Sequence, residues 1–468
     1  MARVQPLSGF PEWSPQDRIL ESHVIGALRD VFALHGFAEI QTRAVEPIGR
    51  LAGDSEASKE IYTLGRLTAQ GDADAKLGLH FDLTVPFARY VEERQGQLHF
   101  PFRRFQIQKV WRGERPQEGR FREFYQADID VVGRDALPEH LESEVAIVMA
   151  RALAALPIPA VRMHVNNRQL VEGFYEGIGI FDVAGVLRSV DKLDKIGPDG
   201  VRSELTGRGI DERAADAVLE LARISSPDAS FATAVQDLWE TTVLVDDGPI
   251  VEAAQLKLAR GIASLVALVT AVNEATGTDS DEPGGGGVAV ADLRIARGLD
   301  YYTGSVYETF LAGHADLGSI CSGGRYDSLI AGGGFPGVGL SIGVSRLVSR
   351  IIGAGLASAS RAVPSAVLVA VTDESARGAS AAIADRLRAR GIACEVSPSA
   401  AKFGKQIQYA DRRGIPFVWF PDAGEGGTAN GASPDGEVKD IRSGEQAPAD
   451  ADAWAPPAED LYPSIVRG

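Results

Sequence analysis

Arginine and aromatic side chains alternate along one short segment of the sequence. Between residues 103 and 122 there are two acidic residues and seven basic ones, namely Arg103, Arg104, Lys109, Arg112, Arg115, Arg120 and Arg122. Alternate residues of a strand face the same side, and guanidinium groups bind phosphate through paired, permanently charged contacts. A hairpin that presents arginines to a polyphosphate is one interpretation. The other is a surface hairpin whose Arg–Glu pairs contribute little to stability.

Three further segments have residue types that suit a pocket for a small polar ligand. Residues 297–304 place an arginine and two tyrosines next to a turn, although a turn before a core strand has the same pattern. Asp82 and Thr84 lie on one side of an extended segment and could hold an ammonium group, although a helix cap before Pro is the commoner reading. Residues 337–346 are glycine-rich and end at Arg346, which is weak evidence by itself.

Composition excludes several classes of protein. The chain has 468 residues, of which 45% are hydrophobic and 24% charged, so it has enough apolar residues for large cores. Cys321 and Cys394 are the only cysteines, which excludes a disulfide scaffold and indicates a reducing compartment. The net charge of −17 argues against a general nucleic-acid binder, and the histidines show no metal-ligand spacing. The longest apolar stretch, residues 262–272, is too short to span a bilayer, and residues 1–13 lack a secretory pattern. We therefore expect a cytoplasmic protein.

Patterns along the chain predict the elements that must position these residues. A helix is expected from Ser14 to Gly36, a long hairpin from residues 103–112 and 121–132, and a helical block over residues 169–276. Strands and helices then alternate beyond residue 365. The expected domains are a main domain that carries these segments (residues 1–168 and 285–353), a helical insertion (169–284), a linker (354–364), an α/β domain (365–446) and a partly ordered tail (447–468).

Taken in this order, the segments resemble the histidyl-tRNA synthetases, a family of class II aminoacyl-tRNA synthetases. The resemblance extends from Gly36 to about Gln446. Residues 112–123 resemble class II motif 2, residues 339–346 resemble motif 3, and residues 297–302 (RGLDYY) and 322–327 (SGGRYD) resemble signatures of the histidine enzymes. Residues 402–406 and 438–446 resemble the family's anticodon-binding domain.

The resemblance implies both a fold and an activity. The implied fold class is α+β, with an antiparallel-sheet catalytic domain, a helical insertion and a C-terminal α/β anticodon-binding domain. The implied enzyme is a histidine–tRNA ligase, which makes histidyl-adenylate from L-histidine and ATP and then passes histidine to the 3′ end of its tRNA. ATP with Mg²⁺, histidine and the tRNA are the implied partners, and a homodimer is implied through motif 1.

The resemblance also implies a role for individual residues. The catalytic pair is Arg112 and Arg297, which would grip the α-phosphate and supply on the order of 3 kcal/mol each. ATP would be held by Arg112, Glu114, Arg120 and Arg346. Histidine would be held by Asp82, Leu83, Thr84, Arg112, Gln126, Asp130, Arg297, Tyr301 and Tyr302, with Asp82, Thr84 and Gln126 on the ammonium and Asp130 and Tyr302 on the imidazole. Gln117 would meet the acceptor end of the tRNA.

Three positions depart from the family pattern. Arg43 stands where motif 1 has proline, Ser345 stands where motif 3 commonly has an acid, and His80 stands where relatives often have arginine. A non-catalytic paralogue, similar to the regulatory subunit of ATP phosphoribosyltransferase, is the alternative function. It is disfavoured because the motif arginines and the domain at residues 365–446 are present. A synthetase-like tRNA-binding module of a stress kinase is also disfavoured, because a kinase segment is absent.

Overall fold

The structure is a computed structural model of the chain. It describes all residues except 1–4, 52–58, 67–75, 244–247, 278–286, 296–301, 329, 331–332 and 423–434. The described residues form two compact units. The first comprises Met1–Pro11 and Val24–Arg350, and the second comprises Glu12–His23 and Ile351–Gly468.

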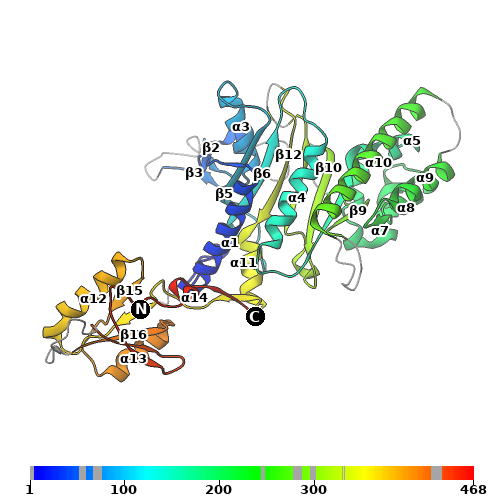
Figure 1. Cartoon of the computed structure of the whole chain (residues 1–468). Coiled ribbons are helices and arrows are strands. Elements are labelled where there is room, and N and C mark those ends of the chain that lie inside the picture. Colours follow the sequence, from blue (N-terminus) through cyan, green and yellow to red (C-terminus); the bar gives the residue numbers. More distant parts are fainter. Residues whose placement is uncertain are drawn as a thin grey trace. The chain divides into compact units, whose positions relative to one another are not determined.

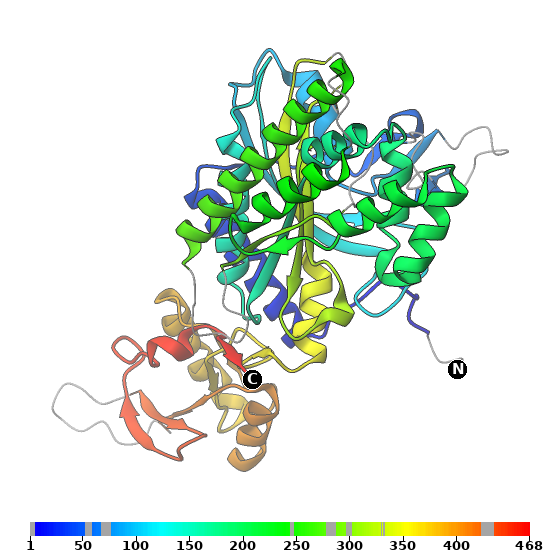
Figure 2. The same ribbon diagram turned by 90° about the vertical axis from the view of Figure 1, so that its right-hand side faces the viewer.

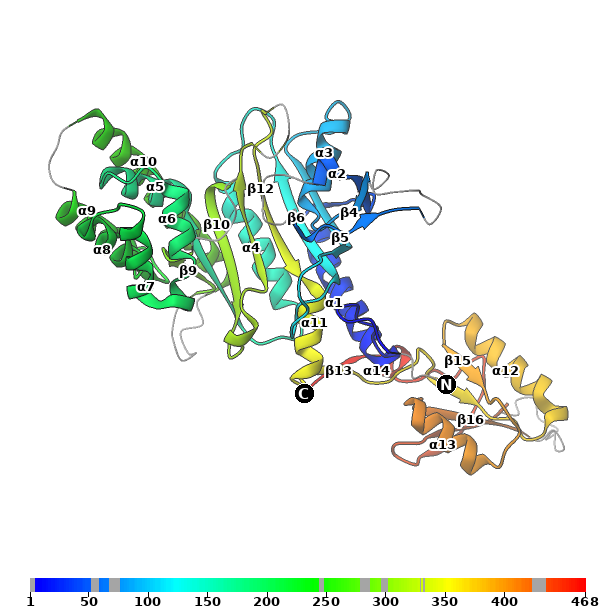
Figure 3. The ribbon, with the colours of Figure 1, turned by 180° about the vertical axis from the view of Figure 1, so that it is seen from behind.

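A mostly antiparallel sheet forms the centre of the first unit. Within the described residues it has nine strands in the order β1 (Ala38–Glu39), β5 (Phe102–Trp111), β6 (Glu123–Val132), β12 (Gly337–Gly343), β11 (Cys321–Tyr326), β10 (Tyr302–Leu311), β7 (Val161–Asn167), β9 (Ala289–Asp292) and β8 (Ser225–Ser226). β5 and β6 pair antiparallel over their full length, so the predicted hairpin is confirmed. Figure 3 shows β6, β12 and β10 of this sheet.

Helices and a small second sheet complete this part of the fold, and the first and last of these helices are divided between the two units. The helices are α1 (Pro15–Leu34), α2 (Ile48–Leu51), α3 (Thr84–Arg94), α4 (His140–Ala154) and α11 (Val344–Gly353). The small sheet has the order β2 (Val45–Pro47), β4 (Leu77–Leu79), β3 (Thr63–Leu64). α1 begins as predicted, because the Asp17 amide donates to Ser14 Oγ, and it ends before Gly36, whose φ is 78°. α4 lies along the sheet in Figure 1 and contacts β6, β7 and β12.

The described part of residues 169–276 is mostly helical, as the sequence predicts. The helices are α5 (Arg168–Gly177), α6 (Val183–Val190), α7 (Leu193–Gly207), α8 (Glu212–Leu221), α9 (Ser230–Thr242) and α10 (Pro249–Thr276). They are the green helices in front of the sheet in Figure 2. α10 is long and apolar enough to cross a membrane, but it packs against α4, α5 and β7, with Leu258, Leu265 and Val272 buried. It is therefore a core helix of this unit.

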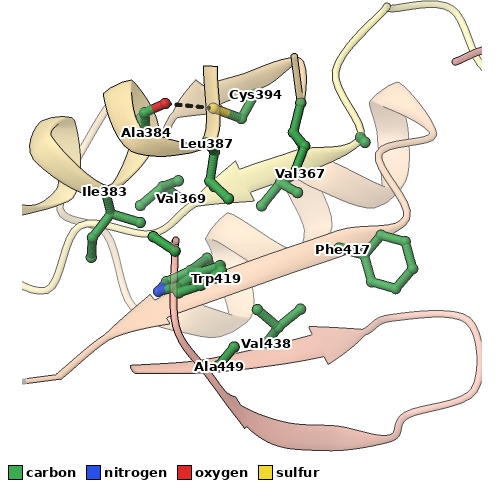
Figure 4. Close-up of a cluster of buried hydrophobic side chains, with 13 residues drawn as sticks. Val367, Val369, Ile383, Ala384, Leu387, Cys394, Phe417, Trp419, Val438 and Ala449 are labelled. Carbon is green, nitrogen blue, oxygen red and sulfur yellow. Dashed lines mark hydrogen bonds between the residues drawn. The ribbon is translucent and has the colours of Figure 1, made fainter. Parts of the chain in front are cut away.

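The second unit contains a five-stranded sheet with a helix on each face. The strand order is β15 (Cys394–Val396), β14 (Val367–Val369), β16 (Phe417–Pro421), β17 (Gly436–Asp440), β18 (Gln446–Ala449). α12 (Arg377–Ala389) packs on the face that carries Val367, Val369 and Trp419 (Figure 4), and α13 (Phe403–Arg413) packs on the face that carries Leu368 and Val418. The predicted alternation of strands and helices is confirmed.

The expectation of a partly ordered tail is wrong. β18 completes the five-stranded sheet, α14 (Ala458–Leu461) follows, and β19 (Ile465–Arg467) pairs antiparallel with β13 (Ala357–Ala359). The linker thus contains a strand, and the tail supplies its partner. Backbone pairing orders these residues although the composition rich in Pro and Asp indicates disorder.

Candidate active site

A cavity of about 460 Å³ opens over the end of the β5–β6 hairpin and the facing strands β10, β11 and β12. Most of the predicted site residues line it, namely Asp82, Thr84, Arg112, Glu114, Arg120, Gln126, Tyr302 and Arg346. These residues come from segments far apart in the sequence, so the fold brings together motifs that are individually weak.

Arg112 is held in place by its neighbours. Its Nε donates to Phe81 O at 2.9 Å, and its guanidinium lies over the Phe124 ring, 5.2 Å from the ring centroid. These contacts fix the direction of the guanidinium and limit the rotamer freedom that is lost when an anion binds. Arg112 can therefore present a preorganised positive charge to a phosphate.

Arg346 lies against the tight turn of the hairpin loop that Arg120 closes. Arg346 Nη1 donates to Ser319 O at 2.9 Å and Nη2 donates to Leu317 O, so backbone carbonyls orient this side chain. Arg120 lies 3.7 Å from Glu114 across the loop. Gly119 between them has a φ of 70°, and a Cβ there would meet the Arg346 side chain at 3.2 Å. The glycine thus allows the loop to pack against Arg346.

Asp82 caps a helix and lines the cavity. Its Oδ1 accepts from Val85 N–H at 3.1 Å in the first turn of α3. The helix cap that the sequence indicates is therefore present, and the same residue lines the cavity. Burial raises the pKa of the Asp82 carboxyl to about 6, while Arg112 acts to lower it. Asp82 can present a negative charge to a bound ammonium group above that pH.

A second cavity of about 30 Å³ is lined by Asp128 and Asp130 and shares Thr84 and Tyr302 with the larger one. Tyr326 Oη donates to Asp130 Oδ1 at 2.8 Å, and Gln126 Nε2 donates to Asp128 Oδ1 at 3.0 Å. Burial raises the pKa of Asp130 to about 7 and also raises the pKa of Asp128, against the opposing effect of Arg104. The cavity therefore offers acceptors to a small polar ring.

Three described residues of the predicted site do not line the larger cavity. Leu83 is fully buried, Asp130 lines the smaller cavity instead, and Gln117 is exposed in the hairpin loop, where its backbone pairs with that of Arg120. Arg297 and Tyr301 lie outside the described residues.

Sequence reasoning missed several residues of the site. Glu308, Cys321 and Ser341 line the larger cavity, and Asp128 lines the smaller one beside a buried Arg104. Period-two alternation from Gln126 would have indicated Asp128, because residues two apart on a strand share a face. Glu308, Cys321 and Ser341 could not be predicted in this way, because their position at the cavity depends on the register between strands.

The three departures from the family pattern have structural partners. Ser345 Oγ accepts from Tyr125 N–H at 2.9 Å and joins the start of α11 to β6. Arg43 pairs with Glu46 at 2.9 Å, and the buried His80 contacts Lys109 O at 2.7 Å through Nε2. These positions do not line either cavity.

The fold and the site together define a class II aminoacyl-tRNA synthetase, because an antiparallel sheet presents motif arginines over a carboxylate-lined pocket. A family model described as histidyl-tRNA synthetase matches residues 9–347, and an anticodon binding domain model matches residues 365–426. The chain belongs to the histidyl-tRNA synthetase family and is a ligase.

Individual relatives agree with this assignment. The chain is 52% identical to the histidine–tRNA ligase of Cutibacterium acnes, with 100% of this chain and 99% of that protein covered. It is 54% identical to that of Bifidobacterium longum subsp. infantis, with 97% and 98% covered. The solved histidyl-tRNA synthetase from Nostoc sp. PCC 7120 superposes with a TM-score of 0.81 at 31% identity, with 97% and 98% covered.

Proposed function

We propose that this chain carries out the family's two-step reaction in the two adjoining cavities. Histidine attacks the α-phosphorus of ATP to give histidyl-adenylate and pyrophosphate, and the histidyl group then passes to the 3′-terminal adenosine of its tRNA. The observation that carries the proposal is the meeting of oriented arginines in the larger cavity with two buried carboxyls in the smaller one.

The arginines are assigned to the phosphates. Arg112 and Arg297 hold the α-phosphate and stabilise the negative charge that grows during attack. Arg120 and Arg346 hold the β- and γ-phosphates, with Glu114 at the loop, so that pyrophosphate leaves in line. The contacts that orient Arg112 and Arg346 support these roles.

The carboxyls are assigned to histidine. Asp82, Thr84 and Gln126 bind the α-ammonium, beside Leu83, and Asp130 and Tyr302 bind the imidazole, with Tyr301 nearby. An amino acid that leaves these buried polar groups unpaired is rejected by roughly 10⁴-fold, so the site itself discriminates. The smaller cavity, about 30 Å³ and lined by polar groups, supports this assignment.

We expect Mg²⁺ to bind to the site together with ATP. The described residues hold no cluster of three or more metal-binding side chains, which fits an ion that is bound mainly through phosphate and one or two carboxylates. Glu114 and Glu308 line the cavity and are the oxygen donors that would hold it. The ion would neutralise phosphate charge.

The proposal extends to the rest of the chain. The tRNA is bound at its acceptor end by Gln117 and at its anticodon by residues 365–446. Residues 1–168 with 285–353 form the catalytic domain, and residues 169–284 form the insertion. The enzyme is a cytoplasmic homodimer, which the family resemblance supports together with two cysteines that are buried and free.

Pyrophosphate exchange into ATP, with each standard amino acid offered separately, tests the activation step. We expect exchange with histidine alone. Absence of exchange with every amino acid, from protein shown to be folded, would contradict the proposal and favour the regulatory paralogue.

A further inference from the structure

One guanidinium lies completely buried beneath the smaller cavity. Arg104 is on β5, directly opposite Asp130 in the β5–β6 register, and its side chain is 0% exposed. Buried arginine is rare unless the charge is paired. Its Nη2 lies 2.6 Å from Asp130 Oδ2 and 3.8 Å from Asp128 Oδ2, and its Cζ lies 4.2 Å from the centroid of the Phe87 ring. The two carboxyls thus supply the opposite charge.

The Asp130 carboxyl is contacted on both oxygens. Oδ1 accepts from Tyr326 Oη, and Oδ2 faces Arg104. Nε, Nη1 and Nη2 of Arg104 all lack a hydrogen-bond partner within the part of the chain that the structure describes, so the contact between Nη2 and Asp130 Oδ2 is an ion pair. The guanidinium therefore depends on Asp130 and Asp128 for stabilisation, and these carboxyls depend on it in turn.

The charges around this pair do not balance without Arg104. Asp128 and Asp130 are neighbours on one face of β6, and two carboxyls that share a buried site do not ionise together readily. The groups that face them are Arg104 from β5, Arg112 at its end, Asp82 before α3, Tyr302 from β10, Tyr326 and Cys321 from β11, and Ser341 from β12. Arg104 is the nearest cation.

We propose that Arg104 is a positioning residue for histidine recognition: it fixes the Asp130 carboxylate toward the smaller cavity and balances the charge of Asp128. This inference rests on the proposed function. Arg104 lines neither cavity, so it acts through Asp130 and does not touch the substrate. An ionised Asp130 accepts a hydrogen bond from a ring N–H of the imidazole. A protonated Asp130 donates a hydrogen bond instead and needs a ring nitrogen that carries no proton. Arg104 therefore determines which proton arrangement of the ring the pocket accepts.

Pyrophosphate exchange of Arg104→Met at varied histidine, ATP and pH tests this role. Methionine keeps much of the length of the side chain and removes its charge. We expect the KM for histidine to rise about tenfold or more, while the KM for ATP changes by less than about twofold. The pH at which the KM for histidine rises should move upward, because Asp130 then holds its proton to higher pH.

A second variant separates positioning from folding. In Arg104→Met combined with Asp128→Asn, one carboxylate is removed along with the cation, so the charge balance is restored. The KM for histidine should then return most of the way to the wild-type value. Arg104→Lys keeps the charge without the planar fork and should give an intermediate KM. Arg103→Met is the matched control, since Arg103 is the preceding residue on the same strand and pairs with Glu144.

Three results would overturn the inference. One is a KM for histidine and a pH profile in Arg104→Met that match those of the wild type. Another is a fall in kcat together with equal rises in the KM for histidine and the KM for ATP, none of which Asp128→Asn reverses. That result would indicate a purely structural role. If the wild-type protein itself exchanges no amino acid, the proposed function fails, and this inference fails with it.

Discussion

Gly339 on β12 faces Asp130 on β6, and a Cβ atom at residue 339 would lie 2.0 Å from Asp130 Oδ1. That separation is far below any real contact between heavy atoms, and the carboxyl cannot move freely because Tyr326 and Arg104 contact its two oxygens. The absence of a side chain at Gly339 therefore makes room for the carboxyl that we assign to the imidazole.

Gly339→Ala should displace the Asp130 carboxyl. We expect the KM for histidine to rise at least about tenfold, with a much smaller change in the KM for ATP, because the arginines that we assign to the phosphates do not line the smaller cavity. Pyrophosphate exchange at varied histidine and varied ATP measures both. Gly26→Ala is the control, since nothing lies within 4 Å of a Cβ at that residue of α1. Unchanged histidine kinetics in folded Gly339→Ala would remove Asp130 from the imidazole site.

Much of this site could be predicted from residue types. Asp82, Thr84, Arg112 and Arg346 can be predicted because each lies in a motif with its own local pattern, and the structure brings them to one cavity. The role of Arg104, which the sequence shows only as one of seven basic residues, could not be predicted, because only the pairing of β5 with β6 places it opposite Asp130. A pattern along one strand says which residues share a face, but the identity of the cross-strand neighbour depends on register.

The tail, residues 447–468, shows a second limit of prediction from sequence. Proline and aspartate after residue 447 are typical of disorder, yet β19 pairs with β13, and Asp450 and Asp452 contact Arg386. The partners of the tail, β13 and Arg386, are both distant from it in sequence. Composition describes only the local preference of a segment and carries no information about such partners.

Histidine binding should weaken as the pH falls. The pKa of Asp130 is raised to about 7 and that of Asp82 to about 6, so each carboxyl is ionised above its pKa and neutral below it. The KM for histidine should therefore increase between about pH 8 and pH 6, as the charge on these acceptors is lost. The imidazole of the substrate titrates near pH 6.5 as well. A histidine analogue whose ring does not protonate in this range separates the two effects.

Asp130→Asn provides the control for this pH dependence. Asparagine keeps the size of the side chain and cannot ionise, so the variant should show a raised KM for histidine at every pH and a shallower pH profile. A wild-type profile that persists in Asp130→Asn would assign the titration to another group.

Arg297→Ala should slow the first chemical step. The residue belongs to the RGLDYY segment, and by resemblance it shares the α-phosphate with Arg112. Loss of one preorganised donor lowers the rate of adenylate formation by about 10²-fold or more, with only a modest change in the KM for histidine. Single-turnover adenylate formation measures this rate. Arg294→Ala is a nearby control, because Arg294 pairs with Asp194 and Asp292 and does not line the cavity. Near-normal adenylate formation in Arg297→Ala would remove its catalytic role.

Trp419→Ala should separate the two steps of the reaction. Trp419 is fully buried in the second unit and packs with Val367 and Val369 (Figure 4). Its ring centroid lies 5.8 Å from that of Trp454. Removing so large a side chain costs about 3–5 kcal/mol, which is comparable to the stability of a small domain. The unit that we assign to the anticodon should then unfold, while the catalytic cavities lie wholly in the first unit.

The measurement is pyrophosphate exchange and tRNA charging on the same preparation of Trp419→Ala. We expect exchange to remain near the wild-type rate and charging to fall by about tenfold or more, because the tRNA loses the contacts of one domain. Tyr462→Ala is the matched control, since Tyr462 is an aromatic residue of the same unit that is 63% exposed. If exchange and charging fell together, the two units would not be independent. If charging were unaffected although the second unit had unfolded, the assignment of anticodon binding to residues 365–446 would be wrong.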